Sequence, residues 1–121
     1  MEEPVAQPER RVHPRYALDT RAMILLIDLR AQFPGRVIDL SLGGCRIRTD
    51  ERFPVGIYRR VETEFKVHGV PVRLGGVVQS MHDRFTVGIR FLDVSTRKLD
   101  QLAQLIAEIG GSKLDADPKP A

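Results

Sequence analysis

Alternation of apolar and polar residues at every second position runs through most of this sequence and constrains its fold more than any other feature. It is clearest over residues 60–67, where four charged residues alternate with Val61, Thr63, Phe65 and Val67. Successive side chains of an extended strand point to opposite faces of a sheet. The segment is therefore predicted to be a strand with one buried face.

Five further segments have strand character, at residues 16–27, 36–40, 45–49, 70–81 and 85–91. Turn residues separate them. Pro34-Gly35 is expected to turn the chain before the second strand, and His68-Gly69 to form a tight turn after the fourth. Gly75-Gly76 inside the long fifth strand predicts a bulge or sharp bend there, which favours closure into a barrel over an open sandwich.

One helix is expected after the last strand. A helical stripe is formed by Leu99, Leu102, Leu105, Ile106 and Ile109. Asp93 or Ser95 is positioned to cap its start, and Gly110-Gly111 to end it. The predicted fold class is all-β with one C-terminal helix, as a six-stranded antiparallel β-barrel.

Both ends of the chain combine proline with charge and offer little to bury. We expect a flexible N-terminal tail over residues 1–9, a barrel domain with its helix over 10–110 and a flexible C-terminal tail over 111–121. No apolar run approaches the roughly 18 residues of a membrane span, and no signal peptide is recognisable. The single cysteine, Cys45, excludes an intramolecular disulfide. A cytoplasmic protein without membrane insertion is expected.

The charge is nearly balanced, with 19 Lys plus Arg against 16 Asp plus Glu, but nearly all the cations are arginine. The planar arginine fork suits phosphate and guanine edges better than lysine does. The predominance of arginine indicates a planar or phosphate-bearing anion as partner.

Two local patterns are candidates for binding. In the first, Arg10-Arg11-Val12-His13-Pro14-Arg15, the proline favours an extended chain, which puts Arg11 and Arg15 on one side, roughly 13 Å apart. The second, residues 39–44, contains Asp39, Ser41 and Gly44. Asp39 can accept the N1–H and N2–H of a guanine, and Gly44 would let a ligand approach the backbone. A solvated basic arm and an ordinary β-turn are the simpler interpretations.

Together, Arg11-x-x-x-Arg15 followed by Asp39-x-Ser41-x-x-Gly44 resembles the paired signature of the PilZ domain family, bacterial domains that bind cyclic di-GMP. Val87-Gly88-Ile89-Arg90-Phe91 is similar to that family's closing strand, so the resemblance covers about residues 9–109. It implies a six-stranded barrel with a C-terminal helix, as expected independently above.

The resemblance also implies a ligand site. Arg11 and Arg15 would bind guanine edges and phosphates, and Asp39 and Ser41 would hold another guanine edge or the backbone around it, with Gly44 shaping the turn. Arg10, just before the first motif, could stack on a base and favours the binding of a stacked pair of ligands. The chain is then a receptor whose N-terminal arm orders on binding cyclic di-GMP and signals to an unidentified downstream protein, as a monomer or homodimer.

No cofactor, metal or catalysis is expected, because the three histidines are scattered and no catalytic motif occurs. Cys45 is predicted to point inward, and Arg46 and Arg48 to lie on the solvated face, where they could extend a basic rim. Two alternatives remain open. One is a nucleotide-independent PilZ-like adaptor. The other is a nucleic-acid-binding barrel, which 6% aromatic residues disfavour, so no DNA partner is expected.

Overall fold

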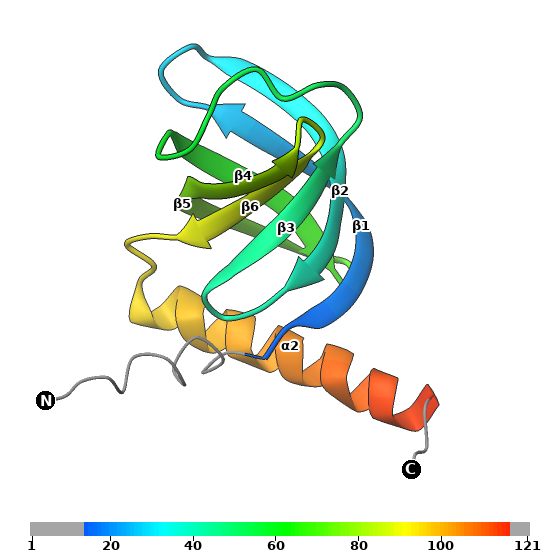
Figure 1. Ribbon diagram of the computed structural model, residues 1–121. Coiled ribbons are helices and arrows are strands. Elements are labelled where there is room, and N and C mark those ends of the chain that lie inside the picture. The colour runs from blue at the N-terminus through cyan, green and yellow to red at the C-terminus, as the bar shows by residue number, and fades with distance from the viewer. Residues whose placement is uncertain (1–13, 117–121) are drawn as a thin grey trace, which may run out of the picture.

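The computed structural model describes residues 14–116 of the chain, with side chains over residues 14–109. Its elements are β1 (Tyr16–Leu26), β2 (Ala31–Leu40), β3 (Gly44–Thr49), β4 (Arg60–Val67), β5 (Val70–Asp83), β6 (Thr86–Phe91) and α2 (Thr96–Ala116). Neighbouring strands are antiparallel and close into a barrel in the order β1-β2-β3-β6-β5-β4 (Figure 1). The predicted fold class is confirmed.

The barrel closes because β5 is long enough to serve two neighbours. Its first half pairs with β4 and its second half with β6, with the change of partner at Gly76 and Val77. The inside is filled by apolar side chains from every strand. Six of them, one from each strand, have exposed fractions of 0%: Ile24, Val37, Ile47, Val61, Val78 and Val87.

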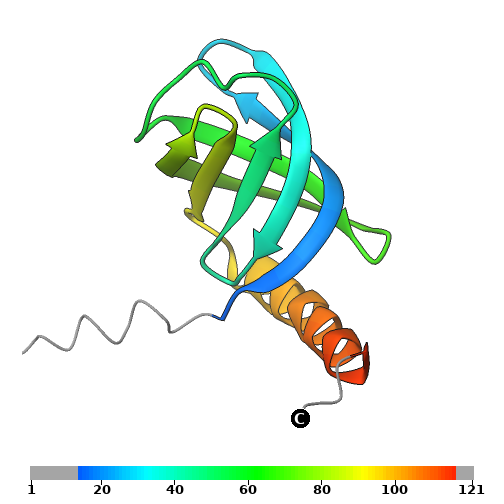
Figure 2. The same cartoon turned by 45° about the vertical axis from the view of Figure 1, so that its right-hand side comes forward.

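The helix α2 covers one end of the barrel, the end at which β1 begins and β2 turns into β3 (Figures 1 and 2). Four residues of the predicted stripe are buried there, at Leu102, Leu105, Ile106 and Ile109. The Ser95 hydroxyl accepts a hydrogen bond from the backbone N–H of Lys98 at 3.2 Å, which confirms the predicted N-cap. No helix within the described residues is long and apolar enough to cross a membrane.

The predicted turn at Pro34-Gly35 and the predicted bulge at Gly75-Gly76 were wrong. Pro34-Gly35 lies inside β2, paired with Met23 and Ala22, and the chain turns earlier, at residues 27–30, where Arg30 has a φ of 54°. Strand pairing on both sides of β2 overrides the local turn preference of Pro-Gly. The β4–β5 register also continues unbroken through Gly75 and Gly76, so no bulge lies there, while a sharp bend at this point stays a prediction.

The predicted helix end was wrong as well, because α2 continues through Gly110-Gly111 to Ala116. A glycine inside a helix costs about 1 kcal/mol but does not forbid the conformation. The helix ends two residues before Pro118. A proline disfavours helical geometry in the residue that precedes it, which gives a stronger stop.

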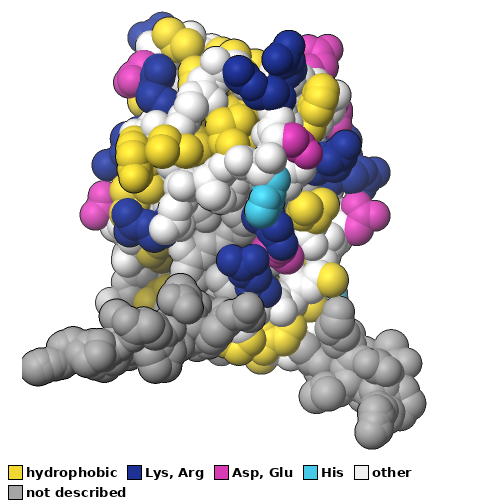
Figure 3. All heavy atoms as spheres, in the orientation of Figure 1, with side chains coloured by type: hydrophobic (Ala, Val, Ile, Leu, Met, Phe, Trp, Pro, Cys, Tyr) yellow, Lys and Arg dark blue, Asp and Glu magenta, His cyan; other side chains and the backbone are white. Residues whose placement is uncertain are grey.

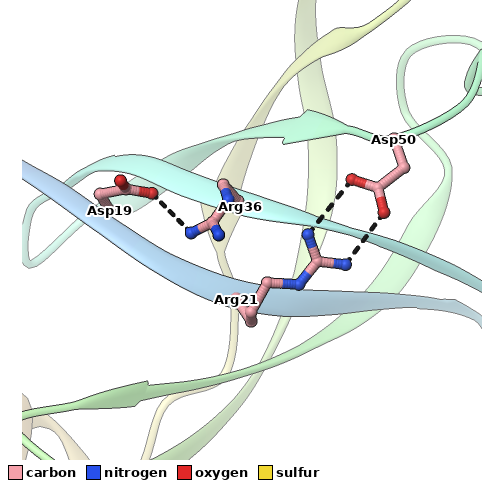
Figure 4. A network of polar contacts seen from close by, with 4 residues as sticks. All are labelled: Asp19, Arg21, Arg36 and Asp50. Atoms are coloured by element: carbon pink, nitrogen blue, oxygen red, sulfur yellow. Dashed lines mark hydrogen bonds and ion pairs between the residues drawn. The ribbon is translucent and has the colours of Figure 1, made fainter.

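Ion pairs neutralise charge on the outer face of β1 and β2. Arg21 and Arg36 lie directly opposite one another in the register, an arrangement that is unfavourable for like charges. Arg21 binds Asp50 at 2.9 Å and Arg36 binds Asp19 at 2.7 Å (Figure 4). The hydrogen bond from Arg21 also lowers the pKa of Asp50. These exposed pairs offset the repulsion between the two arginines.

Gly76→Ala is expected to lower the free energy of unfolding by about 1–3 kcal/mol, as overpacking does. A methyl group at this position would lie 2.5 Å from the carbonyl oxygen of Arg90 on β6. Gly75→Ala is the matched control, since the nearest atom to its methyl group would be the Val61 carbonyl oxygen at 4.0 Å. Urea unfolding followed by circular dichroism measures both variants. Equal destabilisation of the two would contradict the close approach of β6 at Gly76.

Candidate functional site

A pocket of about 240 Å³ lies where the β2–β3 turn meets the second half of β5 and the end of β6. It brings together the two candidate patterns of the sequence, since Arg15 from the first and Asp39, Ser41 and Gly44 from the second all line it. The remaining lining residues are Gly43, Cys45, Arg46, Gln79, Ser80, His82, Gly88, Ile89 and Arg90. Arg10 and Arg11 lie outside the described residues.

Ser41 organises the turn between β2 and β3. Its hydroxyl oxygen accepts hydrogen bonds from the backbone N–H groups of Gly43 and Gly44, both at 3.2 Å, and its own N–H donates to the Gly44 carbonyl at 2.8 Å. The side chain is buried, with 8% exposed. Ser41 therefore has the turn-forming role of the simpler interpretation, and it shapes the pocket wall.

Gly44 is required by the sheet. A methyl group at Gly44 would overlap the carbonyl oxygen of Ile89 on β6. Gly44 pairs with Arg90 in the register, so the close neighbour of its Cα is a strand. The sequence analysis assigned Gly44 to the shape of the turn and to the close approach of a ligand, and the structure adds the close approach of β6.

Asp39 and Arg46 form an ion pair in the pocket wall. They lie directly opposite one another on β2 and β3. The Nε and Nη2 atoms of Arg46 lie 2.9 and 2.8 Å from Oδ2 of Asp39, and Nη1 lies 2.9 Å from Nε2 of His82. Arg46 is therefore held on two sides. Its side chain is 30% exposed and lines the pocket, in keeping with the expectation that it could extend a basic rim, and the register adds a carboxylate opposite it.

Two bulges in β5 bring further residues into the pocket. The β5–β6 register shifts between Val78 and Ser80 and again between Met81 and Asp83, so Gln79 and His82 are the extra residues. A bulge changes the direction of a side chain relative to the regular pleat. Sequence reasoning missed both residues, although the polar run from Gln79 breaks the strand alternation and was the available signal.

The pocket is electropositive over the described residues. Arg15, Arg46 and Arg90 line it, against one carboxylate, Asp39. On the face shown in Figure 3, basic side chains gather near a histidine. An anion with donor and acceptor edges fits this charge pattern, because arginine forks bind phosphate oxygens and the O6/N7 edge of guanine. No group of three His, Cys, Asp or Glu side chains among the described residues is arranged to hold a metal.

Cys45 lies in the pocket wall but points inward, as predicted, with 5% of its surface exposed. Burial raises the pKa of its thiol, and the nearby carboxylate of Asp39 raises it further. The thiol therefore stays protonated at neutral pH. A protonated thiol is a poor nucleophile, so Cys45 contributes packing to the site.

Comparisons with known proteins give the family and the fold. The family model described as "PilZ domain" matches residues 9–108. No curated protein matches the chain. Among solved structures, the "PilZ domain with c-di-GMP of YcgR from Escherichia coli" superposes with a TM-score of 0.74 at 20% identity, covering 92% of this chain and 99% of that one.

Two longer proteins also match. YcgR of Escherichia coli in complex with c-di-GMP has a TM-score of 0.67 at 24% identity, over 88% of this chain and 49% of that one. The Bacillus subtilis inhibitor of motility MotI/DgrA has a TM-score of 0.64 at 10% identity, over 82% of this chain and 50% of that one. This chain therefore spans about half of either protein. At these identities the matches describe a common fold.

Cys45 is expected to be unreactive towards a thiol reagent such as DTNB in the folded protein at pH 8. The reaction should be at least about 100-fold slower than in the guanidinium-unfolded chain, since only the thiolate attacks and burial disfavours it. Absorbance at the wavelength of the released thiolate gives both rates. Immediate stoichiometric labelling of the folded protein would contradict the inward orientation.

Proposed function

The chain belongs to the PilZ domain family, and on that premise we propose that it is a receptor for cyclic di-GMP. One observation carries the proposal. Arg15, from the segment before β1, and Asp39, from the end of β2, line the same electropositive pocket. These are the last residue of the first signature segment and the first residue of the second.

The chemistry of the pocket matches the two parts of this ligand. Cyclic di-GMP presents phosphate oxygens and the O6/N7 acceptors of guanine, which arginine forks bind bidentately. We assign these contacts to Arg15, with Arg90 and Arg46 adding positive charge nearby. Guanine also presents the N1–H and N2–H donors, and we assign these to the carboxylate of Asp39.

The size of the pocket supports a site that is completed by a further segment. Pockets that enclose a drug-sized ligand usually measure about 300–1,000 Å³, and this one measures about 240 Å³. It can hold one guanine with its phosphate, leaving the rest of the dinucleotide uncovered. We propose that residues 10–15 close over that part, with Arg10 and Arg11 as the additional contacts.

We propose a binding role in place of a catalytic one. The thiol in the pocket wall, Cys45, is buried and protonated, and the one pocket carboxylate among the described residues, Asp39, is paired with Arg46. Closure of residues 10–15 would change the surface at the α2 end of the barrel. A downstream protein that reads this change would convert ligand binding into a signal.

Arg15→Ala is expected to weaken binding of cyclic di-GMP by about 2–5 kcal/mol, or roughly 30- to several-thousand-fold, since the ligand loses a charged partner that its binding would bury. Arg11→Ala should have an effect of the same order. Isothermal titration calorimetry, with GTP and cyclic di-AMP as comparison ligands, gives affinity and stoichiometry.

Arg97→Ala is the matched control, because Arg97 is exposed at the start of α2 and does not line the pocket. It removes the same charge and should leave the affinity within about twofold of the wild type. Unchanged affinity in both Arg11→Ala and Arg15→Ala would refute the site. Failure of the wild-type protein to bind cyclic di-GMP would refute the receptor.

A further inference from the structure

The carboxylate of Asp39 is held on one oxygen only. Both contacts from Arg46, at 2.8 and 2.9 Å, are to Oδ2. Oδ1 has no hydrogen-bond partner among the described residues. Two contacts to one oxygen restrict the rotation of the carboxylate, and the other oxygen remains free to accept a hydrogen bond.

This ion pair is more sheltered than the others in the described part of the chain. The Asp39 and Arg46 side chains are 15% and 30% exposed, whereas both partners of every other pair exceed 35%. Surface ion pairs contribute little and exchange readily. The sheltered pair lies in the pocket wall, because the β2–β3 register places Asp39 and Arg46 opposite one another.

His82 supports Arg46 from the opposite side of the pocket. An arginine Nη1 can only donate, so Nε2 of His82 must accept, at 2.9 Å. Only the neutral imidazole with its proton on Nδ1 can do this. The bulge of β5 places this ring here, so β2, β3 and β5 contribute one residue each to a chain of contacts.

We propose that Arg46, held by His82, is a positioning residue that fixes Asp39 to read the exocyclic amine of guanine. The inference rests on the proposed function and adds the source of its base specificity. Arg46 acts through Asp39: with Oδ2 occupied, Oδ1 is the oxygen left to accept the guanine donors assigned to Asp39, the exocyclic N2–H among them. The ligand selected is therefore a purine dinucleotide whose bases carry the exocyclic amino group, which guanine has and hypoxanthine lacks.

The test compares cyclic di-GMP with its inosine analogue, which has the same phosphates and lacks only the amines. The wild type should prefer cyclic di-GMP by about tenfold or more, the usual size of a hydrogen bond to a charged group. In Arg46→Ala the preference should fall to less than about threefold, because Asp39 is no longer oriented. The loss of positive charge weakens the binding of both ligands alike, so it drops out of the ratio of the two affinities.

Arg48→Ala is the matched control. It lies two residues further along β3, carries the same charge, contacts Thr86 and Phe85, and does not line the pocket. Its preference for cyclic di-GMP should equal that of the wild type. His82→Ala serves as the second variant, since it removes the support of Arg46 from another strand, and it should lower the preference as Arg46→Ala does.

The outcomes are distinct. If the wild type binds both dinucleotides equally, or Arg46→Ala keeps the full preference, Arg46 does not position Asp39, while the receptor proposal stands. If Arg46→Ala loses both ligands to the same degree, Arg46 is a phosphate contact and the inference is overturned. If the wild type binds neither ligand, the receptor proposal fails, and the inference fails with it.

Discussion

Closure of the barrel depends on β5, a strand that pairs with β4 through its first half and with β6 through its second. Because β6 also pairs with β3, closure carries the β2–β3 turn to the second half of β5. Asp39 on β2 and His82 on β5 are thereby joined through the two strands between them, β3 and β6. The pocket therefore depends on the pairing of β6 with both β3 and β5, and the six fully buried side chains inside the barrel stabilise this arrangement.

The site is built where the regular strand ladder breaks down. Ile38 is an extra residue on β2 relative to β3, and Gln79 and His82 are extra residues on β5 relative to β6. The bulge at Ile38 puts Asp39 opposite Arg46 while Val37 and Leu40 both remain buried. In a perfectly alternating strand Val37 and Leu40 would point to opposite faces, so one of them would leave the core. The irregularities thus reconcile a continuous core with a cluster of polar groups on its wall.

Local patterns in the sequence predicted most of the fold, and the resemblance predicted part of the site. The six strands, the helix stripe and the Ser95 cap depend on neighbouring residues, and the structure confirms them. The turn predicted at Pro34-Gly35 was wrong because pairing with β1 and β3 decides the conformation of this segment. Phe53 is fully buried against Phe33 from a loop that has no periodic pattern. The contact of Arg46 with His82 spans 36 residues, and no local rule reaches that far.

The arginine-rich composition has its clearest structural use at Arg46. Three nitrogens of one planar group meet two partners here, with Nε and Nη2 on Asp39 and Nη1 on His82. A lysine has a single charged nitrogen on a flexible stem and cannot hold both partners in a fixed geometry. The composition indicated a planar or phosphate-bearing anion as the partner of the arginines. In this pocket the same rigid fork first orders the protein's own carboxylate, and a site ordered before binding loses less entropy when its ligand arrives.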